Sequence, residues 1–103
     1  MTAFVGNGRL ANSSRIVQLI LTRDEAGLSL SLKLHEVELN TQVELRFHHV
    51  SDLKFRGQRT ELTELVLLMA EDMSSHGWEG VHFTVTDYEE EFISFHCERI
   101  ERA

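Results

Sequence analysis

Histidine, cysteine and carboxylate side chains gather near the end of the chain, and these residue types can do chemistry. The stretch SSHGWEGVHFTVTDYEEEFISFHCERIE, residues 74–101, contains the only Trp, the only Tyr, the only Cys and three of the six His residues. A thiol with a neighbouring imidazole can act as a nucleophile, and two facing imidazoles can bind a metal ion. Either chemistry requires the side chains to lie on one face of the element that carries them.

Two alternating segments, VHFTVT and FISFHC, predict a β-hairpin that positions these residues. The polar and acidic residues DYEEE between them fit a surface loop. The simplest register sets Val85 opposite Ile93 and His82 opposite His96, although a shift of two residues keeps the same faces together. The predicted apolar face consists of Val81, Phe83, Val85, Ile93, Phe95 and Cys97.

Cys97 lies on the apolar face of this predicted hairpin, where free cysteines behave as small core residues. A catalytic thiol needs an accessible site that stabilises the thiolate. His96 is next in sequence but points to the opposite face, so it cannot easily act as the base for Cys97 from within the strand. The sequence therefore predicts a buried, structural cysteine and no catalytic residue.

His82 and His96 face each other in the simplest register, with Cβ atoms about 5 Å apart, so both imidazoles could reach one ion. Zinc requires three or four ligands, and the other candidates show no tight ligand spacing; they are His76, Glu98 and His35. We favour a solvated polar face with no metal and no cofactor. A metal-dependent enzyme or metal-binding protein using His82 and His96 stays open as an alternative.

The acidic run between the two segments is interpreted as a charged hairpin tip, because it lacks the alternating ligands and central Gly of a calcium loop. Two large aromatic residues, Trp78 and Tyr88, flank the first hairpin strand, and aromatics of this kind anchor protein interfaces. Trp78 fits equally well as a buried core residue after Gly77. The predicted partner-binding residues are Trp78, Tyr88, Glu89, Glu90 and Glu91.

The rest of the chain also alternates with a period of two, which is typical of half-buried antiparallel strands. LSLSLKLHE places four Leu residues on one face, and RIVQLILTR is its partner across the turn DEAG. Both faces of RIVQLILTR are apolar, which favours a central strand. TQVELRFHHV and SDLKFRG continue the pattern. We expect one domain over residues 1–103, with residues 1–14 edge-like or loosely ordered.

The segment TELTELVLLMAEDMSS, near residues 60–74, is compatible with two structures. Its apolar residues fall at helical spacing and its composition favours a helix, but LVLLMA also fits a short buried strand. The predicted fold is mainly β, an antiparallel sheet or sandwich of about six strands with at most one helix. The alternative is an α+β fold with a helix near 60–74.

Composition narrows the class of function. The chain has 103 residues and a net charge of −7, with 17 acidic against 10 basic residues, and such a surface repels phosphate backbones. Its apolar runs are too short to span a membrane as a helix. No Gly-rich phosphate loop, Gly-x-Ser-x-Gly elbow, His-Glu-x-x-His or Cys-x-x-Cys motif is present. The single Cys and the lack of a signal peptide fit a cytoplasmic protein.

The pattern EDMSSHGWEGVHFTVTDYEEEFISFHCERIE, together with the upstream LRFHHVSDLKFRG, resembles a group of small, largely uncharacterised bacterial proteins. Some of their relatives are described as immunity proteins of polymorphic toxin systems. The resemblance implies a fold of antiparallel strands, with a strand rather than a helix near 60–74. It also implies a protein without catalysis that binds a cognate toxin, although it carries over no interface residue. A structural homo-oligomer, such as a homodimer paired through sheet edges, is a further alternative.

Overall fold

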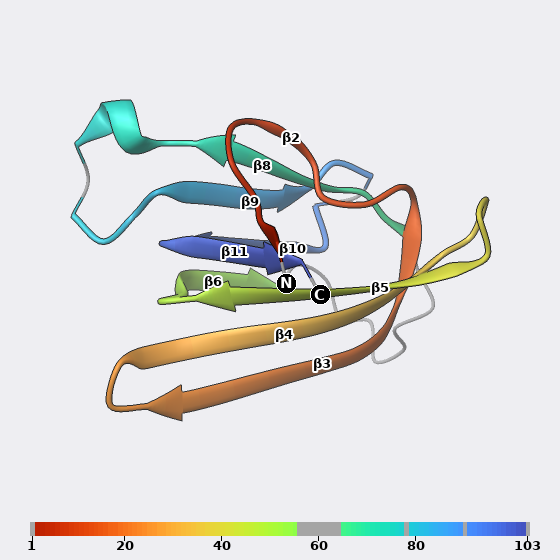
Figure 1. Cartoon of the computed structure of the whole chain (residues 1–103), viewed down its shortest axis with the longest axis horizontal. Helices are drawn as coiled ribbons and strands as arrows, with labels where there is room; N and C mark the ends of the chain where they lie inside the picture. The colour runs from red at the N-terminus through yellow and green to blue at the C-terminus, as the bar shows by residue number, and fades with distance from the viewer. Residues whose placement is uncertain (1, 56–64, 78, 90, 103) are drawn as a thin grey trace.

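The computed structural model describes residues 2–55, 65–77, 79–89 and 91–102. Strands dominate these residues, and the single helical element is a short 3-10 helix, η1, at Ser74–His76 (Figure 1). The strands are β1 (Thr2–Ala3), β2 (Gly8–Arg9), β3 (Ser14–Asp24), β4 (Gly27–Glu36), β5 (Thr41–His48), β6 (Ser51–Phe55), β7 (Leu65–Val66), β8 (Leu68–Asp72), β9 (Phe83–Asp87), β10 (Ile93–Cys97) and β11 (Arg99–Arg102). The predicted mainly β fold is confirmed.

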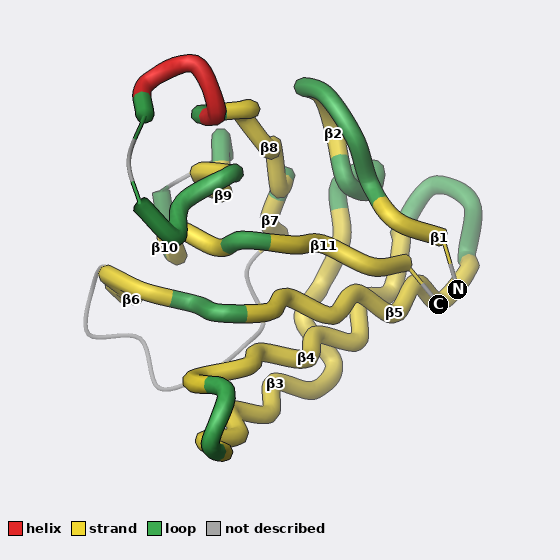
Figure 2. Tube along the Cα trace, turned by 60° about the vertical axis from the view of Figure 1, so that its left-hand side comes forward, coloured by secondary structure: helices red, strands yellow, loops and turns green. Residues whose placement is uncertain are grey.

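The strands form two antiparallel sheets that enclose one core. The first has six strands in the order β1-β11-β5-β4-β3-β7, and the second has five in the order β2-β8-β9-β10-β6 (Figure 2). There are more strands than the six expected, partly because β1, β2 and β7 are two-residue strands at or near sheet edges. No helix among the described residues is long and apolar enough to cross a membrane.

The alternation of β4 explains how the core is built. Leu30, Leu32 and Leu34 have no exposed surface, whereas the residues between them are half-buried. They lie opposite the apolar residues of β5, with Leu32 paired to Leu45. Burial of each such side chain stabilises the fold by about 1.5–3 kcal/mol. Across the core, the ring of Phe47 in the first sheet meets that of Phe95 in the second, with centroids 4.8 Å apart.

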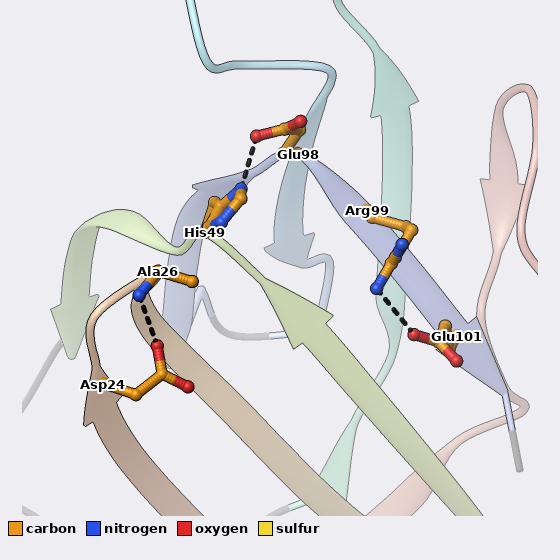
Figure 3. A network of polar contacts seen from close by, with 6 residues as sticks. All are labelled: Asp24, Ala26, His49, Glu98, Arg99 and Glu101. Carbon is orange, nitrogen blue, oxygen red and sulfur yellow. Dashed lines mark hydrogen bonds and ion pairs between the residues drawn. The ribbon is translucent and has the colours of Figure 1, made fainter.

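Two of the points at which the chain passes between the sheets lie next to each other. It leaves the first sheet after β5, where His49 has a left-handed backbone (φ 55°), and returns to it between β10 and β11 at Glu98. The backbone N–H of Glu98 donates to the carbonyl of His48, 2.9 Å away. The His49 imidazole and the Glu98 carboxylate form an ion pair across these crossings (Figure 3). The contact therefore connects the β5–β6 crossing to the β10–β11 crossing.

Residues 65–72 are strands, so the helix considered near 60–74 is wrong for this part of the chain. Leu68 and Ala70 of β8 are buried, with Met69 half-buried between them, and Ala70 lies opposite Val85 of β9. Pairing on both sides, with β2 and β9, outweighs the helical propensity of these residues. Residues 60–64 lie outside the described residues.

The two apolar faces of RIVQLILTR predicted a central strand, but β3 has a described strand on both sides only at its start. It pairs with β4 along its length, with a bulge between Ile16 and Gln18, but it pairs with β7 only at Ser14 and Arg15. Figure 1 shows β3 along the lower margin of its sheet. Beyond Arg15, this strand is an edge within the part of the chain that the structure describes.

The N-terminal residues lie against both sheets. β1 pairs with β11 and β2 pairs with β8, each at the edge of its sheet. Leu10 is 2% exposed and donates its N–H to the carbonyl of Leu68 at 2.9 Å. The buried carboxylate of Glu36 accepts hydrogen bonds from the Asn12 N–H at 2.8 Å and the Thr41 hydroxyl at 2.9 Å. The hydrogen bond between Glu36 and Asn12 thus connects the segment before β3 to the end of β4.

Candidate partner-binding site

The C-terminal hairpin has the predicted faces but a different register. β9 and β10 pair Thr86 with Ser94 and Thr84 with His96, two residues away from the simplest register. Phe83, Val85, Ile93, Phe95 and Cys97 are all buried, as the alternation predicted. The predicted pairing of His82 with His96 is therefore wrong.

Asp87 explains the shift of register. Its carboxylate has no exposed surface, although the sequence placed it in a surface loop. It accepts hydrogen bonds from the backbone N–H groups of Leu67 and Glu89 at 2.9 Å each, and of Phe92 at 3.0 Å. These bonds hold Glu89 and Phe92 against Asp87, so the strand pair closes at Thr86 and Ser94 rather than at Phe92.

The two histidines of the predicted metal site contact different carboxylates. His82 Nε2 lies 3.5 Å from Asp72 Oδ2, and His96 Nε2 lies 3.6 Å from Asp52 Oδ2. Hydrogen bonds from the hydroxyl and the backbone N–H of Ser74, together with His82, hold the pKa of Asp72 below its ordinary value. Among the residues that the structure describes, no three His, Cys, Asp or Glu side chains are placed to hold a metal ion.

Cys97 is fully buried on the core face of β10, as predicted. Removal from water raises the pKa of its thiol to about 12, so the thiol stays protonated near neutral pH. A protonated thiol without access to solvent is a poor nucleophile. The geometry supports a packing role for this residue.

The outer face of the five-stranded sheet carries a groove of about 600 Å³. Its floor is made of short hydroxyl side chains on β9 and β10, namely Thr84, Thr86 and Ser94, which alternate with the buried core residues. Longer side chains surround this floor and leave the hollow between them. The complete lining is Asp52, Lys54, Phe55, Thr84, Thr86, Glu91, Ser94, Phe95 and His96.

A second hollow of about 420 Å³ extends this groove to the hairpin turn. It is lined by Thr86, Asp87, Tyr88 and Glu91, and it shares Thr86 and Glu91 with the first. Tyr88 is 64% exposed at the turn and Phe55 is 47% exposed on β6. Phe55 on β6 and Tyr88 at the turn are therefore exposed aromatic residues in the lining of the two hollows.

Two residues of the groove have a positive φ, in the left-handed region of backbone conformation that residues other than glycine rarely adopt. They are Asp52 (φ 53°) and Glu91 (φ 55°). Each such conformation costs roughly 1–3 kcal/mol and is found most often where a side chain serves a function. The Asp52 carboxylate lies 3.4 Å from the ammonium group of Lys54 and faces His96, so the rim at β6 mixes both signs of charge.

The predicted partner-binding residues divide between this groove and other places. Tyr88 and Glu91 line the second hollow, whereas Glu89 accepts a hydrogen bond from the Ser13 hydroxyl at 3.1 Å. Trp78 and Glu90 lie outside the described residues.

Sequence reasoning missed Asp52 and Phe55. Their segment alternates like any strand, and only its pairing with β10, for example of Phe55 with Ile93, brings these residues to the site. The exposed aromatic ring at the end of SDLKF was the one available signal.

A family model described as "Immunity protein PIM8" matches residues 10–102. The chain belongs to this family of immunity proteins. The match covers strands β3 to β11 and every residue that lines the two hollows. It agrees with the resemblance found in the C-terminal pattern. No curated protein and no solved structure matches the chain.

Proposed function

We propose that this protein is a non-catalytic, cytoplasmic immunity protein that binds a cognate toxin and blocks its activity by contact. Membership of the PIM8 immunity protein family over residues 10–102 is the observation that carries the proposal. The groove on the outer face of the five-stranded sheet is the proposed toxin-binding surface.

The residues of the groove suit a protein partner. Exposed aromatic side chains that can be desolvated, here Phe55 and Tyr88, are typical anchors of protein interfaces. The hydroxyl groups of Thr84, Thr86 and Ser94 offer hydrogen-bond donors and acceptors between these anchors. A partner strand or loop laid along the groove would therefore meet apolar, polar and charged groups in turn.

The charge of the chain favours a basic toxin surface. The net charge is −7, and Asp52 and Glu91 both lie on the groove. Opposite charges steer two proteins together and raise the rate of association. We therefore expect the toxin to place an Arg or Lys side chain near Asp52 or Glu91.

The buried state of Cys97 supports a role without catalysis, as does the separation of His82 from His96 across the β9–β10 pair. An enzyme needs a nucleophile, base or metal gathered at one accessible place. The groove does bring the His96 imidazole within 2.9 Å of the Thr84 hydroxyl and within 3.6 Å of the Asp52 carboxylate, so the proposal of binding without turnover rests on the family and on the buried thiol.

The test is inhibition of the toxin encoded beside the gene for this chain. Purified protein should abolish the activity of the toxin domain, and Phe55→Ala should weaken binding about tenfold or more, as expected for an interface anchor. Leu39→Ala is the control, because Leu39 is also an exposed apolar residue, 60% exposed against 47% for Phe55, and lies in the β4–β5 turn. Full toxin activity at saturating protein would contradict the proposal, and equal effects of the two variants would remove the groove from it.

A further inference from the structure

His96 lies in the groove between a hydroxyl group and a carboxylate. Its Nδ1 is 2.9 Å from the Thr84 hydroxyl oxygen on β9, and its Nε2 is 3.6 Å from Asp52 Oδ2 on β6. All three residues line the groove, and 24% of the His96 side chain is exposed. The imidazole therefore contacts polar groups that a partner in the groove would also meet.

The two neighbours of His96 decide which ring nitrogen carries the hydrogen of the neutral imidazole. A neutral imidazole has one donor and one acceptor nitrogen, whereas an ionised carboxylate can only accept. The Asp52 oxygen favours the hydrogen on Nε2, so Nδ1 accepts a hydrogen bond from the Thr84 hydroxyl. In this state the Asp52 carboxylate and the remaining lone pair of the Thr84 oxygen are both acceptors in the groove.

Protonation of His96 reverses its hydrogen bond with Thr84. An imidazolium carries a hydrogen on both nitrogens, so Nδ1 donates to the Thr84 oxygen. The hydroxyl hydrogen of Thr84 must then turn to another acceptor. Protonation therefore replaces an acceptor of the groove with a donor, and it adds a positive charge beside Asp52.

The described charged and titratable groups around His96 lie on β6, β8 and β9, directly before β9, and at the two ends of β10. They are Asp52 and Lys54 on β6, Glu71 and Asp72 on β8, His82 before β9, Asp87 at the end of β9, Glu91 before β10 and Glu98 after it. Between about pH 5 and 8 histidine is the side chain whose charge ordinarily changes. Of the two histidines in this set, His96 lines the groove and His82 does not.

We propose that toxin binding in the groove competes with protonation of His96, so that the complex weakens in mildly acidic solution. This inference rests on the proposed function, in which the toxin brings an Arg or Lys side chain to the groove. The N–H donors of such a cation need acceptors, and the neutral state offers the Asp52 carboxylate and the Thr84 oxygen. The protonated state offers a donor and a like charge instead.

The direction of the pH dependence follows from the number of protons bound. A toxin cation beside His96 makes protonation of the imidazole less favourable, so the complex holds fewer protons than the separate proteins. Lowering the pH therefore favours the separate proteins. A like charge at this range shifts a proton equilibrium by about one unit or more, which corresponds to about tenfold or more in affinity.

Binding of the purified toxin domain at pH 8 and at pH 5.5 tests the competition. The dissociation constants of the unmodified protein and of His82→Asn should both rise about tenfold on going to the lower pH. His96→Asn keeps a donor and an acceptor but does not titrate, so its dissociation constant should change much less. Titration of the toxin itself acts equally on all three proteins. A change for His96→Asn as large as that for the unmodified protein would overturn the proposal.

Nuclear magnetic resonance of the imidazole nitrogens follows the same competition in the unmodified protein. At pH 8 the hydrogen of His96 should be on Nε2, and addition of the toxin domain should move the titration of His96 to lower pH. A hydrogen on Nδ1, or the same titration of His96 with and without the toxin, would contradict the proposal.

The outcome at pH 8 separates this inference from the proposed function. Toxin that stays fully active at pH 8 in the presence of saturating protein would remove both. Inhibition at pH 8, combined with equal pH dependence of the unmodified protein and His96→Asn, would remove only the competition with protons.

Discussion

His96 lies directly opposite Thr84 in the β9–β10 pair, and its Nδ1 is 2.9 Å from the Thr84 hydroxyl. This relationship separates the imidazole of His96 from that of His82, which contacts Asp72 instead. It also places His96 in the lining of the groove, beside a floor of hydroxyl side chains. Of the two residues that suggested a metal site, His96 therefore lines the groove, whereas His82 does not.

Filling the groove should block the toxin. Ser94 lies in the middle of the floor, between Thr86 on β9 and Lys54 on β6. Ser94→Trp would occupy the hollow, so we expect a loss of toxin affinity of at least about tenfold, as for loss of an interface anchor. Titration calorimetry with the toxin domain measures it.

Ser29→Trp is the matched control for this change, because Ser29 is also half-buried and lies in a strand of the other sheet. It should bind the toxin like the unmodified protein. Unchanged affinity of Ser94→Trp would show that the toxin binds elsewhere.

The sequence predicted which faces of the strands would be buried, but it could not predict the register of the last hairpin. Alternation alone allows shifts of two residues, and the choice between them depends on Asp87. Asp87 is the first residue of DYEEE, so from the sequence it looks like part of a solvated loop. Among the described residues, its backbone donors include Leu67, which is distant in sequence, so the sequence gives no local sign of its burial.

The position of β3 in its sheet and the formation of the groove also depend on pairing between strands that are distant in sequence. An apolar strand such as RIVQLILTR can be central or can be an edge, and its composition does not distinguish the two. The groove joins β6 to β9 and β10 from distant parts of the chain. Local patterns therefore predicted strands, and the arrangement of the strands created the site.

Asp87 should be a major source of stability. Asp87→Ala leaves three backbone N–H groups without their acceptor, and each buried, unsatisfied group costs about 1–3 kcal/mol, so we expect a loss of about 3 kcal/mol or more in the free energy of unfolding. Urea unfolding measures the loss. Asp24→Ala is the control, since its exposed carboxylate accepts one backbone bond, from Ala26 at 2.8 Å (Figure 3), and should cost less than about 1 kcal/mol. Equal losses would contradict this role.

Glu36 should make the fold sensitive to acid. The hydrogen bond from the Asn12 N–H, with the one from Thr41 and the charge of Arg102, lowers the pKa of this carboxyl below its ordinary value of 4.5. A lowered pKa in the folded state contributes stability above pH 4.5, and this contribution is lost as the pH falls through the folded-state pKa.

Urea unfolding between neutral pH and pH 3 therefore should show a smaller loss of stability for Glu36→Gln than for the unmodified protein, although the variant starts less stable. Glu25→Gln, in the exposed β3–β4 turn, is the control and should follow the unmodified protein. A Glu36→Gln profile parallel to that of the unmodified protein would show that this carboxyl is not responsible.

The thiol of Cys97 should not react with thiol reagents in the folded protein. Its burial and its pKa of about 12 predict no reaction with a thiol reagent until urea unfolds the chain. Cys97→Ser should lower the free energy of unfolding by about 1–3 kcal/mol, because it buries a hydroxyl in an apolar core. Cys97→Ala tests whether loss of volume alone explains the change. Rapid labelling of the native protein would contradict the proposed packing role.

The most direct test of inhibition by binding is the amount of this protein needed to inhibit a fixed amount of toxin completely. Binding without catalysis predicts that toxin activity falls linearly and reaches zero at one chain for each toxin molecule, with the toxin recovered intact from the complex. Loss of toxin activity at a small fraction of that amount, or recovery of a chemically altered toxin, would show turnover and contradict the account.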